Sequence, residues 1–600
     1  MASNSDFRSV PGSVPDGGGR GWRRAAAALA GSGLAAGVAL LVAAIGLKAE
    51  SSVQWPAYTT SNVLRALTTF GQASVIAVLC TAVVLARAGV SPTETVWERW
   101  APGLAKLLSW IGISGLVTIT IGMPLAATRL YLSGLSPDQQ WRSELLGRFA
   151  DSPAWRDGTY LGLPPDEAVG WYWLVGRATT MVGIPGWEAL KLSAIFSISV
   201  AAVLALVWWS RLLRADVAIV VAAATTAMAL YAAPNPAFTV CLLLLSPALV
   251  AAWSALRGAA ANPAATAGFT RRATNSRQVW ARLLGVGAYL GLCAVFDQSA
   301  FVVAASAVTA LALLAVALPM EQHAGFERRK EWRGALGRWL VLAAMAVVTV
   351  TLVWGPYLRL RGLSQFTEVQ VSAAALGAAV RVVLTAAGLL VAVATMRVAS
   401  AIVSKPEQLG RVAAAVGVIG SVWLCQQIPD ALEIPIAAAY SDTDGKGVRA
   451  DDFPTSAVHS YQNVDKAITE ATTRPRRDSV LLTGDTTLLA IYPYSGFLGQ
   501  SARYSNPLAN YDSRVRQIRD WAALGSPEEL IAALDASPLP APTVFVLRRS
   551  GSDYLLRSAT DPGNDNGVSR IYTTIAFPAT LFDEYFTRAE VGPFTVLVRR

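Results

Sequence analysis

The feature that most constrains this chain is a series of long apolar runs. A helix needs about 20 residues to cross a bilayer core of roughly 30 Å. Hydrophobic residues make up 53% of the 600 positions and charged residues only 15%, which is typical of polytopic α-helical membrane proteins. Eleven spans are expected near residues 25–47, 71–88, 104–127, 187–209, 216–233, 237–254, 280–296, 299–318, 339–355, 375–400 and 411–426.

Composition divides the chain into three regions. Residues 1–24, rich in Ser, Gly and Pro, are expected to form a disordered cytoplasmic tail. Residues 25–427 are expected to form the membrane domain, with an external loop at 128–186. The first apolar run could instead be a signal peptide, but its length exceeds the 7–15 residues of a signal core, which favours a retained anchor.

Residues 428–600 differ in character from the membrane region. Proline and charge become more frequent, and short apolar runs at 480–483, 543–547 and 594–598 predict buried strands. Ser526 followed by Pro527 and two glutamates predicts a helix start. We expect an extracytoplasmic α/β domain.

Arginine positions predict the orientation. They precede the first run and fill two connections, around 257–282 and 328–338. The positive-inside rule then places the N-terminus on the cytoplasmic side of the membrane, with the loop at 128–186 and the C-terminal domain outside. The net charge of +10 is therefore explained by topology, and no nucleic-acid partner is expected.

Cysteine and histidine usage excludes several chemistries. The four cysteines fall in apolar runs, and the only two histidines lie far apart in the sequence, so neither a disulfide framework nor a metal centre is expected. No nucleotide-binding glycine motif is present. Residues 441–445, Ser-Asp-Thr-Asp-Gly, hint at a calcium loop but lack its full ligand set, which favours a turn. No cofactor is predicted.

Asp138 is the candidate catalytic residue. It follows the third run, at the expected boundary between membrane and water. A sugar donor built on a lipid phosphate would hold its reactive carbon at this height, where a carboxylate could accept the proton of an acceptor hydroxyl. The alternative is a capping box, with Ser136 as N-cap, Pro137 at N1 and Gln139 at N3, in which Asp138 serves the helix dipole. The residues leave both interpretations open.

A departing lipid phosphate would need cations whose donors match its oxygens. The candidates for binding the donor phosphate or sugar are Arg129, Gln139, Gln140, Arg142 and Lys191. Glu188 and Lys191 could instead form an interfacial ion pair. Most of the other loop carboxylates are expected to be solvated, namely Glu144, Asp151, Asp157, Asp166 and Glu167.

Aromatic side chains crowd the same loop and recur in the C-terminal region. The candidates for stacking on an acceptor sugar are Trp171, Tyr492, Tyr494 and Tyr504. An interfacial aromatic belt and ordinary core packing are the competing explanations.

An ordered set of short motifs adds a resemblance. In the membrane half it includes Trp55-Pro56-Ala57, Gly122-Met123-Pro124-Leu125, Leu130-Tyr131-Leu132, Asp138-Gln139-Gln140 with Arg142, and Leu161-Gly162-Leu163-Pro164-Pro165. In the C-terminal half it includes Tyr492-Pro493-Tyr494 and Asn506-Pro507-Leu508. With these motifs the chain resembles the galactan 5-O-arabinofuranosyltransferases of mycobacteria and related actinobacteria.

The resemblance implies a GT-C-like membrane glycosyltransferase. Its donor would be decaprenylphosphoryl arabinose and its acceptor the galactan of cell-wall arabinogalactan, on which it would add the first arabinofuranosyl residue. Asp138 would correspond to the catalytic aspartate of that superfamily, acting with inversion at the anomeric carbon.

Two departures from the family pattern leave room for other functions. Residues 166–169 differ from the family sequence after Pro165, and the stretch 354–410 is shorter than expected. The alternatives are a lipid or polysaccharide transporter and an inactive scaffold in the wall-synthesis complex. Only a transferase would add a pentose to galactan.

Overall fold

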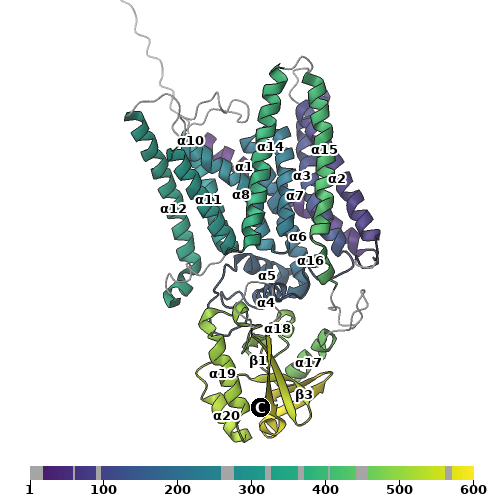
Figure 1. The fold of residues 1–600 in the computed structure, drawn as a ribbon, viewed down its shortest axis with the longest axis vertical. Helices are drawn as coiled ribbons and strands as arrows, with labels where there is room; N and C mark the ends of the chain where they lie inside the picture. The colour runs from purple at the N-terminus through teal and green to yellow at the C-terminus, as the bar shows by residue number, and fades with distance from the viewer. Residues whose placement is uncertain are drawn as a thin grey trace, which may run out of the picture.

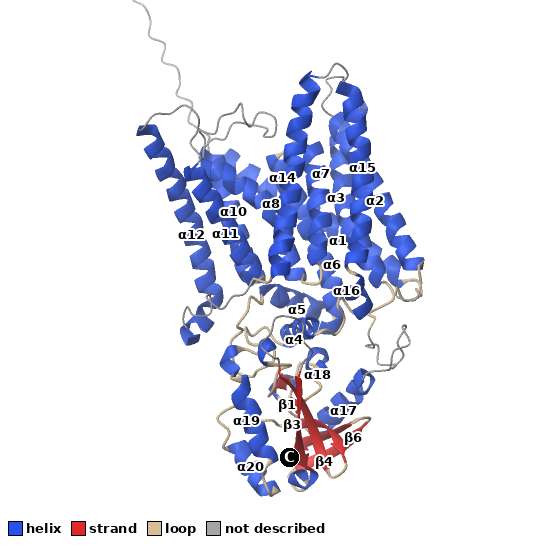
Figure 2. Ribbon diagram, in the orientation of Figure 1, coloured by secondary structure: helices blue, strands red, loops and turns tan. Residues whose placement is uncertain are grey.

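The computed structural model describes residues 18–58, 61–88, 96–257, 276–317, 326–361, 371–402, 406–440, 457–560 and 571–600. A bundle of long helices occupies one end of the molecule and a mixed domain with a β-sheet the other, with two shorter helices between them (Figures 1 and 2). Most of the expected N-terminal tail, residues 1–17, and the expected turn at 441–445 lie outside the described residues.

Ten helical segments in the described residues are long and apolar enough to cross a membrane, and they coincide with ten of the expected spans. The eleventh expected span, 411–426, lies within α15 (Pro406–Ala431). The ten segments belong to α1 (Gly18–Ser51), α2 (Val63–Ala88), α3 (Val96–Val117) with its continuation, α6 (Gly186–Leu212), α7 (Ala215–Ala229), α8 (Pro236–Arg257), α10 (Ser276–Phe296), α11 (Gln298–Ala317), α12 (Phe326–Arg361) and α14 (Ala373–Ile402).

The third span does not end as a regular α-helix. It continues as a π-helical turn at Thr118–Gly122 and a 3-10 turn at Met123–Leu125. Gly122 permits this path because a Cβ there would lie 2.9 Å from the Glu50 carboxylate. Lys191 Nζ donates to the Leu125 carbonyl at 2.6 Å. Since these contacts fix where the chain leaves the bundle, they also fix the approach to Asp138.

Two helices, α4 (Pro137–Asp151) and α5 (Gly170–Val182), lie between the membrane helices and the C-terminal domain (Figure 1). Their close packing depends on glycine. A Cβ on Gly176 would lie 2.7 Å from the Phe149 Cβ, and one on Gly186 would lie 2.7 Å from the Gly147 Cα. Helix α4 is therefore held firmly against both α5 and the start of α6.

The C-terminal domain is built on a seven-stranded sheet. Strand β1 (Val480–Thr483) is parallel to β2 (Ser495–Gly496) and β3 (Val544–Ser550), whereas β3 is antiparallel to β4 (Asp553–Thr560) and β7 (Phe594–Arg599). Strand β5 (Ile571–Pro578) pairs with β4, and β6 (Phe586–Val591) pairs with β7. The three strands expected from the sequence are confirmed as β1, β3 and β7.

Helices cover both faces of the sheet. Alternate strand residues such as Leu481 and Val544 pack with α17 (Tyr461–Ala471). Their neighbours, such as Phe545, pack with α19 (Tyr511–Ala522) and α20 (Pro527–Asp535). This alternation follows from the two-residue period of a strand. The expected helix start is also confirmed, because the Ser526 hydroxyl accepts from the Glu529 amide at 3.3 Å. The domain has an α/β architecture, as the sequence indicates.

The C-terminal domain is joined to the α4–α5 region by specific hydrogen bonds. The buried Arg148 guanidinium donates to the carbonyls of Gly158 at 2.9 Å and of Tyr494 at 2.7 Å. The Gly496 amide donates to the Thr159 carbonyl at 2.8 Å. Arg148 donates to carbonyls of both regions and so fixes their relative position. A site between the two regions is therefore well defined.

Candidate functional site

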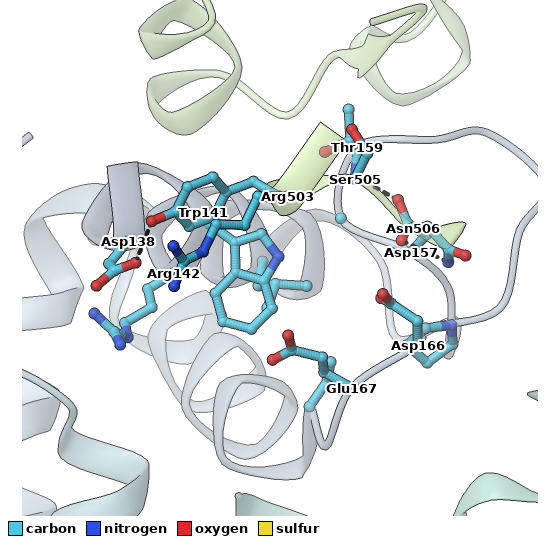
Figure 3. A pocket seen from close by; sticks show the side chains of 15 residues that line it. Asp138, Trp141, Arg142, Asp157, Thr159, Asp166, Glu167, Arg503, Ser505 and Asn506 are labelled. Carbon is cyan, nitrogen blue, oxygen red and sulfur yellow. Dashed lines mark hydrogen bonds between the residues drawn. The ribbon is translucent and has the colours of Figure 1, made fainter. Parts of the chain in front are cut away.

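A cavity of about 230 Å³ lies between α4, the segment 157–169 and the segment 503–506 of the C-terminal domain. Asp138, Arg142 and Trp141 line it from α4, and Arg503 lines it from the C-terminal domain (Figure 3). Tyr504 also lines it from the C-terminal domain. The volume is below the 300–1,000 Å³ of drug-sized ligand sites and suits a single small ring. Both parts of the chain are needed to enclose it.

Asp138 stands exposed in this cavity, at the start of α4. Its Oδ1 accepts a hydrogen bond of 2.6 Å from the Tyr504 hydroxyl (Figure 3). This hydrogen bond orients the carboxylate from the opposite domain, while the N-terminus of α4 favours its negative charge. The carboxylate is thus preorganised and reachable by a ligand.

The capping-box alternative is only partly realised. Ser136 occupies the N-cap position, but its side chain makes no cap hydrogen bond. Gln139 does not reach back to the N-cap; its Nε2 donates to the carbonyls of Leu132 at 2.7 Å and Pro234 at 2.8 Å. Pro137 at N1 and the dipole remain sufficient to start the helix. Asp138 is therefore available for interactions within the cavity.

Two guanidinium groups line the cavity with Asp138. Arg142, one helical turn further along α4, interacts electrostatically with Tyr172, Asp138 and Asp297, and its buried Nε has no hydrogen-bond partner within the described chain. Arg503 enters from the C-terminal domain and is exposed. Figure 3 shows both guanidinium groups towards the Asp138 end of the cavity. Anionic oxygens are the groups such a pair would bind.

The side chains of the two glutamines after Asp138 donate hydrogen bonds to backbone carbonyls and do not line the cavity. Gln139 is fully buried, with the hydrogen bonds given above. Gln140 Nε2 donates to the Leu135 carbonyl at 2.8 Å, and its Oε1 accepts from the Thr486 hydroxyl at 3.4 Å. Their contacts position the first turn of α4, on which Asp138 lies.

The structure places Arg129 and Lys191 outside the residues that line the cavity. Arg129 pairs with Glu188 at 3.4 Å, with its side chain largely exposed. Lys191 donates to the carbonyls of Leu125 at 2.6 Å and Thr128 at 2.8 Å. Because its ammonium group already donates to two backbone carbonyls, Lys191 anchors the end of the third span.

Of the four aromatic candidates, Tyr504 alone lines the cavity. Trp171 is buried and donates to the Ser197 hydroxyl at 3.2 Å. Tyr494 is fully buried, and its hydroxyl donates to Asp465 at 2.7 Å. Tyr492 is half-buried under the Arg476 guanidinium, 5.8 Å from the ring centre. Core packing therefore accounts for Trp171 and Tyr494.

Two loop carboxylates expected in solvent are buried instead. Glu144 is on the inward face of α4, and desolvation raises the pKa of its carboxyl to about 7. Asp157 accepts from the Thr159 amide at 2.9 Å, the Tyr160 amide at 2.6 Å and the Asn506 side chain at 3.0 Å. Burial raises the pKa of Asp157 as well. Asp157 is held by Asn506 of the C-terminal domain, a contact between distant parts of the chain that local sequence patterns do not predict.

Sequence reasoning gave no role to two groups of the cavity wall, Arg503 and Glu167. Glu167 is exposed and lines the cavity. Partial desolvation by the surrounding protein, and then the charge of Asp297, raises the pKa of its carboxyl. Asp297 lies between α10 and α11. Its place between two apolar runs is a sequence signal that could have marked Asp297 as a candidate functional residue.

Within the described residues, no group of three or more His, Cys, Asp or Glu side chains is placed to hold a metal ion. The charged groups of the cavity wall are instead carboxylates and guanidinium groups. Together they could accept a proton at one end and hold an anionic leaving group beside it.

The fold and the cavity define a polytopic membrane protein with an enclosed polar site where its membrane bundle meets a C-terminal α/β domain. Comparison with known families then gives the assignment. Residues 33–376 match the family described as "Arabinofuranosyltransferase N terminal", and residues 428–599 match "Arabinofuranosyltransferase A C terminal". The chain belongs to this arabinofuranosyltransferase family, as the sequence motifs predict.

Curated relatives agree over almost the full length. The chain is 35% identical to the galactan 5-O-arabinofuranosyltransferase of Mycolicibacterium smegmatis, covering 94% of this chain and 97% of that protein. It is 34% identical to that of Mycobacterium leprae, with the same coverage. It is 27% identical to that of Corynebacterium glutamicum, covering 95% of each.

Proposed function

We propose that this protein transfers an arabinofuranosyl group from decaprenylphosphoryl arabinose to a hydroxyl of galactan, and so primes arabinan in arabinogalactan synthesis. The names of its relatives support the sugar and the acceptor. The observation that carries the mechanism is the Asp138 carboxylate, open to a cavity next to the membrane helices and flanked by Arg142 and Arg503.

Orientation is part of the proposal. We infer that the N-terminus is cytoplasmic and that α4, α5 and the C-terminal domain lie outside the plasma membrane. Arg211 and Arg257 end their helices at the end of the bundle remote from α4, as the positive-inside rule favours for the cytoplasmic side. The donor's prenyl tail would then remain in the bilayer while its phosphate reaches the cavity.

The reaction proposed is a single displacement with inversion. Asp138 accepts the proton of the galactan hydroxyl as its oxygen bonds to the anomeric carbon. The bond between that carbon and the phosphate oxygen breaks, and its electron pair stays with the lipid phosphate. Arg142 and Arg503 stabilise the charge that grows there, and the proton on Asp138 passes to water. A positioned base of this kind contributes about 10²–10⁴-fold.

The other predicted donor contacts receive supporting roles. Gln139 and Gln140 hold the turn that carries Asp138. Arg129 and Lys191 lie outside the cavity lining, and we assign the phosphate to Arg142 and Arg503 instead. Tyr504 holds Asp138 at 2.6 Å and forms the wall on the acceptor side.

The test uses purified full-length protein with lipid-linked arabinose and galactan oligomers. Mass spectrometry should show a pentose added to the oligomers, and Asp138→Asn should lower its rate by at least about 100-fold. The matched control is Asp151→Asn, which changes a carboxylate at the far end of the same helix, 3.8 Å from Arg477. Substrate movement without a new glycosidic bond would indicate a transporter, and no turnover by the unaltered protein would indicate a scaffold.

A further inference from the structure

A second cavity lies at the opposite end of the membrane bundle, between α1, α6, α8 and α10. It is an open groove of about 710 Å³. Its walls are mainly apolar, with Leu204, Val207, Leu244 and Leu292 among them. Arg211 and Arg282 also line it, and among the described residues that do so none is acidic.

The two arginines differ in how they are satisfied. Arg211 donates to the Ala28 carbonyl at 3.2 Å and the Ser32 hydroxyl at 3.0 Å. Arg282 is partly buried in the second turn of α10 and has neither a hydrogen bond nor an ion pair within the described chain. A guanidinium withdrawn from water without an acceptor is costly. The positive charge of Arg282 therefore has no partner among the described residues, and it lies beside the apolar walls of the groove.

This groove is remote from the Asp138 cavity. Helix α10 carries Arg282 near its start, and Asp297, which interacts with Arg142, follows its end. Fifteen residues of helix separate Arg282 from Asp297, roughly 22 Å at 1.5 Å per residue. A lipid phosphate at Arg282 could not also be a leaving group beside Asp138, so the groove suits a different lipid.

We propose that this groove binds an anionic glycerophospholipid of the membrane leaflet opposite the Asp138 cavity. Its phosphate accepts hydrogen bonds from Arg282 and faces Arg211, and one acyl chain lies along the leucines. Basic pockets between membrane helices recognise anionic headgroups in this way. Gly285 leaves the space open, since a Cβ there would meet nothing closer than Trp208 Cζ2 at 3.8 Å.

The experiment titrates the full chain in detergent with dioleoylphosphatidylglycerol or dioleoylphosphatidylcholine and counts bound lipid by native mass spectrometry. With two arginines at the site, phosphatidylglycerol should bind roughly thirtyfold more tightly. Arg282→Gln should weaken that binding at least fivefold. Gly285→Leu, which fills the groove without changing charge, should abolish it.

The matched control is Arg214→Gln. Arg214 lies at the same end of the bundle but pairs with Asp216 at 3.3 Å and does not line the groove, so its replacement should leave lipid binding unchanged. Equal affinity for the two lipids in the unaltered protein would overturn the proposal even if the groove variants fail to fold. Displacement of bound phosphatidylglycerol by decaprenyl phosphate would also overturn it, because the groove would then be a donor-lipid site.

Discussion

The Tyr504 hydroxyl donates to Asp138 Oδ1 at 2.6 Å, and this hydrogen bond joins residues 366 positions apart. Tyr504 belongs to the C-terminal domain and Asp138 to the loop after the third span. The C-terminal domain therefore reaches directly into the candidate catalytic centre.

Replacing Tyr504 with phenylalanine should weaken catalysis without preventing folding. A hydrogen bond to a charged group contributes about 1.5–3 kcal/mol, so kcat/KM for arabinosyl transfer should fall at least roughly tenfold. Tyr585→Phe, an exposed tyrosine of the same domain, is the control and should keep full activity. A Tyr504→Phe enzyme with unaltered kinetics would show that Asp138 needs no support from this domain.

Arginine substitutions should separate the cations inside the cavity from those outside it. Arg142→Gln removes a group that lines the cavity, and losing one stabiliser of developing charge costs about 10²–10³-fold in kcat. Arg129→Gln removes an exposed partner of Glu188 and should change kcat by less than about threefold, since a surface ion pair contributes little. Steady-state kinetics of both variants make the comparison, and the reverse ranking would move the phosphate site to Arg129.

Asn506→Ala should loosen the contact between the domains. The buried Asn506 amide donates to Asp157 Oδ2 at 3.0 Å and to the Pro164 carbonyl at 2.8 Å. Leaving such acceptors unpaired costs about 1–3 kcal/mol each, and hydrogen exchange across residues 157–165 should rise. Gln517→Ala, whose amide bonds Ser537 within the C-terminal domain, should leave that exchange unchanged.

Glu144→Gln should remove a pH-dependent loss of stability. Desolvation raises the pKa of Glu144 from 4.5 to about 7, so the folded protein holds this proton more tightly than the unfolded chain. The contribution of Glu144 to the free energy of unfolding is therefore fully present below pH 4.5, and it is lost as the pH rises through 7. The cost at pH 8 is on the order of 3 kcal/mol.

Thermal unfolding in detergent measures the effect. The variant should melt at a higher temperature than the unaltered protein at pH 8 and at a similar temperature at pH 4.5. Asp151→Asn, at an exposed position of the same helix, should show no such difference. Equal melting curves for Glu144→Gln and the unaltered protein at pH 8 would mean that Glu144 carries no desolvation penalty.

The sequence predicts the membrane helices and the strands well because each depends on local apolar periodicity. That Asp138 and Arg142 lie near each other beside a span could be predicted for a related reason, since both follow from local sequence. Both residues line the cavity, and their roles stay a proposal. Arg503 could not be predicted, because its approach depends on how a distant domain docks. The burial of Glu144 and Asp157 was also missed, because it depends on tertiary contacts and not on local sequence patterns. Arg129 and Lys191 have the right charge, but tertiary contacts turn Lys191 towards backbone carbonyls.

The position of β7 in the sheet has a consequence for biosynthesis. This strand, Phe594–Arg599, pairs with both β3 and β6, so the sheet cannot close until the ribosome has released the chain beyond residue 599. The wall that contains Arg503 and Tyr504 belongs to the same domain and follows β2 in the chain. A nascent protein with every membrane helix inserted would still lack a finished candidate cavity, and a nonsense codon a few positions upstream should abolish the proposed transfer.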